Sequence, residues 1–117
     1  MTILVTGGTG LVGARLLPRL VETGIGCRAL VRAGKAVPPR VAVVEGDVLD
    51  PASLTAAVSG VEAVVHLAGL LRTSDARQIW QVNLEGTRNL IDAVKSHAPS
   101  ARFVMASTGL VYNETSA

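Results

Sequence analysis

The chain has 117 residues, a length that fits a single domain. Hydrophobic residues make up 49% of the sequence but aromatic residues only 3%, so we expect a core of Val, Leu, Ile and Ala. The formal net charge of +2 comes without a cluster of Lys and Arg residues, which argues against a nucleic-acid partner. No apolar run approaches the roughly 18–20 residues of a membrane span, so we expect a cytoplasmic protein with no membrane partner.

Cys27 is the only cysteine of the sequence, which excludes an internal disulfide and a cysteine-based metal site. It lies in a short apolar run, so we interpret it as a small core residue of a strand rather than as a reactive thiol. We expect no metal centre.

Short apolar runs alternate with longer segments of helical periodicity along the whole chain. The apolar runs predict five strands, over residues 3–5, 27–31, 41–44, 63–67 and 102–106. The periodic segments predict helices over 11–24, 51–58 and about 75–97. Strands that alternate with helices indicate a doubly wound α/β fold with a parallel sheet, and a first strand at the switch point gives the strand order 3-2-1-4-5. We expect one domain over residues 1–117.

The ends of the predicted helices carry typical signals. Pro18 lies inside the first helix and predicts a kink or bend, since an interior proline removes a hydrogen bond and costs ~3 kcal/mol. Gly24 is the expected stop of that helix. Asp50 is a candidate cap ahead of Pro51 in the first turn of the second helix, and Pro99 closes the long third helix.

The segment Thr6-Gly7-Gly8-Thr9-Gly10-Leu11-Val12-Gly13 joins the first predicted strand to the first helix. Gly7 permits a tight turn, Gly10 lets the backbone approach a pyrophosphate, and Gly13 allows close packing of the helix on the strand. The free N–H groups at the start of the helix then bind phosphates. A plain glycine-rich turn is the alternative. We predict a dinucleotide site whose contacts here are Gly7, Thr9, Gly10, Leu11, Val12 and Gly13.

The run ILVTGGTGLVG resembles the start of the extended short-chain dehydrogenase/reductases, also called the NAD-dependent epimerase/dehydratase family. Four further segments match in order and spacing, so the resemblance covers essentially the whole chain. It implies a Rossmann-type fold and an NAD(P)-binding domain. Asp47-Val48 resembles the family's adenine-contacting pair, whose carboxylate accepts from the exocyclic amine, and His66-Leu67-Ala68-Gly69 resembles the segment that lies along the cofactor.

The remaining two matches concern the active site. Asn83 begins a segment that resembles the family's N-x-x-G-T, in which the Asn supports the active-site hydrogen-bond network and lies near the cofactor. Residues 106–112 resemble the family's ending of strand five, where Ser107 would contact the cofactor. Thr108 takes the position of the catalytic Ser/Thr, four residues before Tyr112.

Simpler interpretations stay open for individual residues. Asp47 is alternatively a cap of the following turn. His66 fits a hydrogen-bonded residue at a strand end better than a general base. Asn83 is alternatively an ordinary exposed helix residue. Trp80 is assigned to packing or to an oligomer contact, without chemistry.

The end of the second predicted strand bears on the choice of cofactor. NAD-preferring members have an acidic residue there that binds the ribose 2′-OH, whereas residues 30–35 of this chain contain no carboxylate. Arg32 matches a 2′-phosphate through its planar guanidinium, and Lys35 adds a second positive charge. We therefore predict NADP in preference to NAD. The alternative is a solvated surface arginine.

The family's Tyr-x-x-x-Lys pair does not occur in these 117 residues, and Tyr112 is no substitute, since no lysine follows it four residues on. We expect the N-terminal, cofactor-binding part of an oxidoreductase, epimerase or dehydratase, truncated after strand five, without a substrate domain and inactive alone. Its substrate would be a nucleotide sugar or a similar hydroxyl or keto metabolite. The alternative is a non-catalytic NADP-sensing regulatory protein. The resemblance also implies a homodimer through the helix near 75–97.

Overall fold

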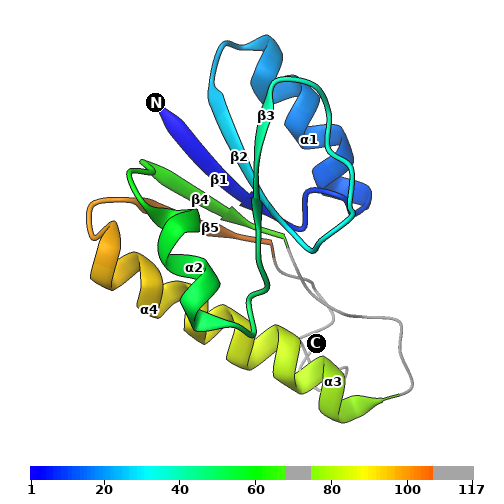
Figure 1. The fold of residues 1–117 in the computed structure, drawn as a ribbon, viewed down its shortest axis with the longest axis vertical. Helices are drawn as coiled ribbons and strands as arrows, with labels where there is room; N and C mark the ends of the chain where they lie inside the picture. Colours follow the sequence, from blue (N-terminus) through cyan, green and yellow to red (C-terminus); the bar gives the residue numbers. More distant parts are fainter. Residues whose placement is uncertain (68–74, 107–117) are drawn as a thin grey trace, which may run out of the picture.

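Five parallel strands form one sheet in the order β3-β2-β1-β4-β5. The computed structural model describes residues 1–67 and 75–106 (Figure 1). The predicted fold class and strand order are confirmed. The strands are β1 (Thr2–Thr6), β2 (Gly26–Val31), β3 (Val41–Glu45), β4 (Ala63–His66) and β5 (Arg102–Met105). Because β1 lies in the centre, the chain builds the sheet outward on one side through β2 and β3 and then on the other through β4 and β5, which creates a switch point between β1 and β4.

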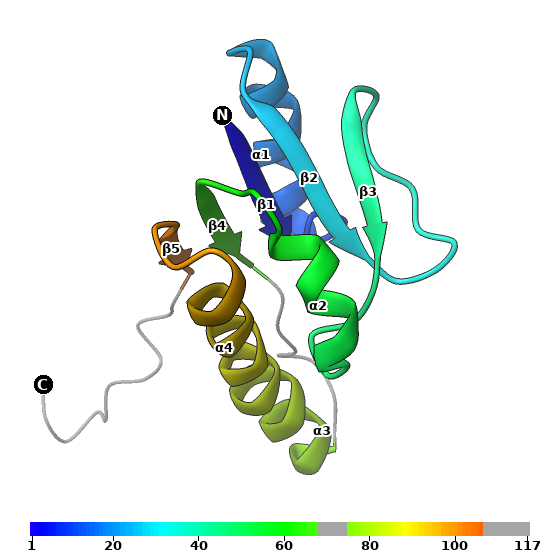
Figure 2. The same ribbon diagram turned by 60° about the vertical axis from the view of Figure 1, so that its left-hand side comes forward.

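Helices cover both faces of the sheet. They are α1 (Leu11–Glu22), α2 (Pro51–Val58), α3 (Ala76–Trp80), the π-helical segment η1 (Gln81–Gly86) and α4 (Thr87–His97). Helix α1 packs on one face, and α2 and α4 pack on the other, as the two views show together (Figure 2). The result is three layers, with the sheet in the middle.

Alternate strand residues point into two separate aliphatic cores, as the period of a strand requires. Leu4 of β1 points into the core under α2 and α4, whereas its neighbour Val5 points into the core under α1. The buried members of both cores are Leu, Val, Ala and one Cys, which confirms the expected aliphatic composition. Cys27 is 5% exposed in β2, and burial raises the pKa of its thiol, as suits a core residue.

The structure confirms some of the features predicted for α1 and α2 and contradicts one of them. Helix α1 is continuous through Pro18, and the predicted kink stays a prediction. Gly24 follows the helix at φ +81°, the left-handed conformation expected of a stop. Asp50 is the N-cap residue of α2, but the prediction that its side chain caps the helix is wrong. The Ser53 N–H, which such a side chain would bind, donates instead to the main-chain carbonyl of Asp50 at 3.1 Å.

The predicted helix near 75–97 is one helical rod with a π-helical centre. The carboxylate of Asp75 caps its start and accepts from the N–H groups of Arg77 at 3.0 Å and Gln78 at 3.3 Å. The rod ends at His97, two residues before Pro99, as expected. The six π-helical residues Gln81–Gly86 were not predicted, because hydrophobic periodicity does not register a change of hydrogen-bond pattern within a helix.

Candidate functional site

A pocket of about 320 Å³ lies at the carboxyl edge of the sheet, beside the switch point. Open α/β sheets bind their ligands at this position. The lining comes from the ends of β1 and β2, from the segments that follow β1, β2, β3 and β4, and from the π-helical segment. Its residues are Thr6, Gly7, Thr9, Gly10, Leu30, Val31, Arg32, Lys35, Gly46, Asp47, Val48, Leu67 and Val82.

The glycine turn forms one side of this pocket. Gly7 has φ +72°, a conformation that favours glycine, and its carbonyl accepts the N–H of Gly10 at 3.0 Å, which closes a tight turn. Gly10 is the N-cap residue of α1 and has no side chain to bond the first N–H groups of the helix. These N–H groups and the positive end of the helix dipole suit an anionic ligand.

Gly13 lies buried beneath the turn. A Cβ atom at Gly13 would collide with the carbonyl oxygen of Gly7 and with the backbone of Gly8, so only glycine fits there without movement of the turn. The tight turn predicted at Gly7 is therefore confirmed. Gly13 lets the start of α1 lie against the backbone of that turn, and the close packing on the strand itself stays a prediction. The side chains of Leu11 and Val12 are 79% and 61% exposed and do not line the pocket, so their contact with a cofactor stays a prediction.

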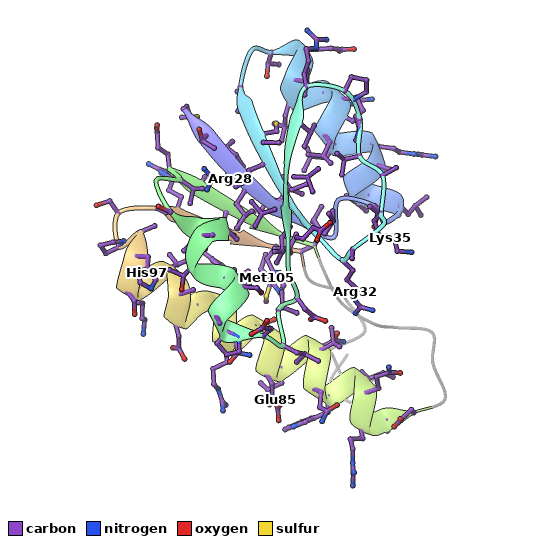
Figure 3. The ribbon with its side chains drawn as sticks, in the orientation of Figure 1. Arg28, Arg32, Lys35, Glu85, His97 and Met105 are labelled. Atoms are coloured by element: carbon purple, nitrogen blue, oxygen red, sulfur yellow. The ribbon has the colours of Figure 1, made fainter. Side chains whose placement is uncertain are left out.

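Charged residues follow the ends of β2 and β3. The Nε atom of Arg32 lies 3.8 Å from Oδ2 of Asp47, and Lys35 lines the same pocket. Arg32 and Lys35 both extend from the loop after β2 (Figure 3). The other carboxylate oxygen of Asp47, Oδ1, accepts the N–H of Leu49 at 2.9 Å, so the interpretation of Asp47 as a turn cap is confirmed. A carboxylate has two oxygens, and this cap leaves Oδ2 toward Arg32.

The long helix fixes the wall that contains Val48. Asn89 of α4 donates from Nδ2 to the main-chain carbonyl of Val48 at 2.9 Å. The helix approaches this wall so closely that a Cβ atom at Gly86 would lie 2.6 Å from Cγ2 of Val48. These contacts give Gly86 and Asn89 a role in shaping the pocket.

His66 is 2% exposed and bonds on both sides of its ring, to the Thr6 hydroxyl at 2.6 Å and to the Thr87 hydroxyl at 2.9 Å. Burial lowers the pKa of the imidazole, which favours its neutral form. The interpretation as a hydrogen-bonded residue at a strand end is confirmed. Leu67, the next residue, lines the pocket, and its N–H donates to the Thr6 carbonyl and hydroxyl, both at 3.1 Å.

Asn83 lies in the π-helical segment and is partly buried rather than exposed. Its main-chain carbonyl accepts the hydroxyl of Thr87 at 2.8 Å, and its neighbour Val82 lines the pocket. The contacts predicted for Asn83 with a cofactor and an active site stay predictions. Ala68, Gly69, Ser107, Thr108 and Tyr112 lie outside the described residues, so the structure does not test the roles predicted for them.

Several lining residues were not predicted from the sequence, among them Thr6, Leu30 and Val82. Thr6 had a usable signal, because it is the one polar residue between an apolar run and the first glycine. No sequence signal identifies Val82 as a pocket residue, because a single valine in a helical pattern does not indicate which distant part of the chain it contacts.

Residues 1–67 and 75–106 contain neither a candidate metal site nor a candidate membrane-spanning helix. These residues contain no group of three or more His, Cys, Asp or Glu side chains that could hold a metal ion. Among the helices of the same residues, none has the length and apolar character needed to cross a membrane.

A parallel sheet of order 3-2-1-4-5 with a glycine turn beside its switch point is typical of the dinucleotide-binding α/β proteins. Within that class, the chain belongs to the NAD dependent epimerase/dehydratase family, whose model matches residues 3–117. The resemblance inferred from the motifs is therefore confirmed.

Curated relatives include a 3 beta-hydroxysteroid dehydrogenase/Delta 5→4-isomerase of Mycobacterium tuberculosis, 36% identical over 93% of this chain and 32% of its own length. A ceramide reductase of Caulobacter vibrioides is 33% identical over 91% of this chain and 34% of its own length. The chain thus spans about a third of the length of these relatives.

Solved structures agree with this assignment. A short-chain dehydrogenase/reductase superfamily protein from Agrobacterium tumefaciens with bound NAD superposes with a TM-score of 0.82 at 35% identity, over 97% of this chain and 34% of its own. A UDP-glucose 4-epimerase from Thermus thermophilus in complex with NAD gives a TM-score of 0.82 at 29% identity, over 93% of this chain and 38% of its own.

Proposed function

We propose that the chain supplies the nicotinamide-dinucleotide site of an enzyme that oxidises or reduces a hydroxyl or keto carbon. One observation carries the proposal. A single pocket brings together the glycine turn, two cationic side chains and the Asp47-Val48 wall. The cofactor itself supplies the hydride chemistry when bound, and this chain binds and orients it.

The pocket fits a dinucleotide on physical grounds. The turn at Gly7 and Gly10 presents backbone without side chains beside the start of α1, which is the arrangement that a pyrophosphate needs. The wall of Asp47 and Val48 offers a carboxylate acceptor and an apolar side chain to an adenine. Family membership supports this fit independently.

We also propose that NADP is preferred to NAD. In residues 1–67 and 75–106, the Arg32 guanidinium pairs with Asp47 and with no other carboxylate. The side chains of this pair are 64% and 39% exposed, and so open a pair contributes little. Arg32 therefore retains donors for a 2′-phosphate, with Lys35 as a second cation at the same pocket.

For the substrate we propose a nucleotide sugar or a similar metabolite with a hydroxyl or keto carbon. The UDP-glucose 4-epimerase among the similar structures supports the sugar, and the hydroxysteroid dehydrogenase among the relatives supports the hydroxyl. Thr108 would bind the reacting oxygen, and Asn83 would support the site. Without a Tyr-x-x-x-Lys pair, these 117 residues should bind the cofactor but not turn a substrate over.

The helix of residues 75–97 is proposed as the contact of a homodimer. Trp80 of α3 is 62% exposed, and Ile91 of α4 is 36% exposed, so the rod presents apolar surface to solvent. Sedimentation velocity should show a dimer that Trp80→Gln weakens. A monomer at every concentration would contradict this proposal.

A titration of the chain with NADPH and with NADH, followed by the fluorescence of the reduced nicotinamide, tests the proposed function. We expect saturable binding of both, tighter for NADPH, and no turnover with an added alcohol or ketone. Absence of binding by a chain whose circular dichroism shows the folded state would overturn the proposal. Equal affinities, or a tighter NADH, would overturn the preference alone.

A further inference from the structure

The buried His66 connects three elements that meet behind the pocket. It lies at the end of β4, and its ring nitrogens bond Thr6 at the end of β1 and Thr87 at the start of α4. Thr6 is 1% exposed, and both histidine contacts are shorter than 3 Å. The proposed binding of a cofactor makes no direct use of this imidazole, so its position needs a separate explanation.

The direction of each hydrogen bond follows from the donors and acceptors present. The Thr87 hydroxyl has one hydrogen and donates it to the Asn83 carbonyl at 2.8 Å, since a carbonyl only accepts. Thr87 Oγ1 must then accept from His66, which places a proton on Nε2. In the neutral ring Nδ1 is an acceptor, so the Thr6 hydroxyl donates to it, while Thr6 Oγ1 accepts the N–H of Leu67 at 3.1 Å.

The two ends of this chain of bonds lie at functionally different places. At one end, Thr6 and Leu67 line the pocket, and Thr6 directly precedes the glycine turn. At the other end, the Asn83 carbonyl lies in the π-helical segment, where the backbone N–H of Thr87 donates to Leu84. The Thr87 hydroxyl therefore satisfies a carbonyl within a rearranged turn, of the kind often found at functional sites.

We propose that His66 is a positioning residue of the cofactor site. Held as the neutral tautomer with its proton on Nε2, it couples the edge of the pocket at Thr6 and Leu67 to the π-helical segment that carries Asn83. The identity of the ligand as a nicotinamide cofactor rests on the proposed function. The coupling between Thr6 and the π-helical segment is a property of the unliganded chain.

Histidine suits this position because it accepts on one side of its ring and donates on the other. Gln places an amide nitrogen near the position of Nε2, so His66→Gln retains a donor toward Thr87 and loses the acceptor for Thr6. Asn places its carbonyl oxygen near the position of Nδ1, so His66→Asn retains the acceptor for Thr6 and loses the donor toward Thr87. The two variants thus separate the two halves of the chain of bonds.

The tautomer is measured directly by ¹⁵N NMR of the imidazole in the full 117-residue chain. We expect a protonated Nε2 and an unprotonated, hydrogen-bonded Nδ1 for His66 at neutral pH. A proton on Nδ1, or an average of the two tautomers, would overturn the assigned directions and with them the proposal.

The coupling is measured by hydrogen exchange of the Leu67 amide, which reports on Thr6. Thr87→Val removes the hydroxyl with little change of shape, and we expect it to speed this exchange two- to about fivefold, the effect of weakening one hydrogen bond. Thr87→Ser keeps the hydroxyl and should restore the wild-type rate. In the His66→Asn background, which lacks the link already, Thr87→Val should add nothing. Faster exchange confined to residues 83–88 would show that the two ends are independent and would refute the proposal.

Cofactor binding distinguishes this inference from the proposed function. Thr87→Val should weaken NADH binding about two- to fivefold by the same loss, and Thr87→Ser should not. A chain that binds neither cofactor, yet shows the expected tautomer and exchange, would refute the proposed function and leave the coupling intact. Normal binding by Thr87→Val would limit the role of His66 to folding and refute its positioning of the site.

Discussion

Arg32 and Asp47 pair at the carboxyl ends of neighbouring parallel strands, with Nε of one 3.8 Å from Oδ2 of the other. The sheet register brings them together, because Val31 lies opposite Glu45 and the Gly46 N–H donates to the Val31 carbonyl at 2.9 Å. The pair therefore brings the residue expected to select the cofactor beside the residue expected to bind its adenine.

The proposed NADP preference predicts an asymmetric effect of Arg32→Gln. Loss of a charge-assisted hydrogen bond to the 2′-phosphate should weaken NADPH binding about tenfold, with little change for NADH. Lys95→Gln makes the same change of charge on the exposed side of α4 and serves as the control. Isothermal titration of both cofactors is the measurement. An equal loss for the two would show that Arg32 does not distinguish them.

The geometry of the glycine turn predicts that a substitution at Gly13 lowers stability, whereas a substitution at Gly10 weakens cofactor binding. Gly13→Ala places a Cβ against the Gly7 carbonyl oxygen and should lower the free energy of unfolding by about 1–3 kcal/mol. At Gly10 the nearest atom to a new Cβ is the same oxygen, at 3.3 Å, a contact that a small shift relieves. Gly10→Ala should therefore fold but bind both cofactors about tenfold more weakly, because the methyl group enters the phosphate site.

Urea unfolding and NADH titration of the two glycine variants separate these effects. The expected result is a shifted unfolding midpoint for Gly13→Ala and a shifted dissociation constant for Gly10→Ala. Wild-type affinity in Gly10→Ala would mean that no ligand approaches the turn at that residue.

Arg28 predicts a purely structural effect far from the cofactor chemistry. Its Nη1 atom lies 2.8 Å from the carbonyl oxygens of Ala57 and Ser59, so a cation of β2 binds the C-terminal end of α2 (Figure 3). Arg28→Gln should lower the free energy of unfolding by about 1–2 kcal/mol and leave NADH binding unchanged. Thermal unfolding beside the exposed control Arg88→Gln measures it. An unshifted midpoint would show that these bonds contribute nothing.

The sequence was sufficient for what depends on local pattern and failed where distant segments meet. Apolar runs and glycines predicted the strands, their order and the turn. Hydrophobic period and the backbone freedom of glycine depend on neighbouring residues in the sequence, so they can be recognised without the structure. Hydrophobic period does not record the π-helical hydrogen bonds of Gln81–Gly86. No local pattern shows that Val82 lies at the pocket or that Gly86 packs against Val48. Asp is a common N-cap residue, so a side-chain cap by Asp50 was expected from the sequence. The Ser53 N–H donates instead to the main-chain carbonyl of Asp50.

His66 predicts a pH dependence of stability. Burial lowers its pKa below the ordinary value of 6.5, and its contacts Thr6, Thr87 and Phe103 carry no charge. Between the two pKa values the unfolded chain binds more protons than the folded one, so stability rises with pH in that window. The stabilisation is complete above about pH 6.5 and is lost as the pH falls toward the lowered pKa, by at most about 1.4 kcal/mol per pH unit.

Urea unfolding at half-unit steps from about pH 7.5 to 5.5 measures this loss, in a window above the titration of ordinary carboxylates. His66→Gln removes the titrating group and should flatten the profile, even if its stability is lower throughout. The same slope in wild type and His66→Gln would assign the pH dependence to other groups and would contradict a neutral, buried imidazole at this position.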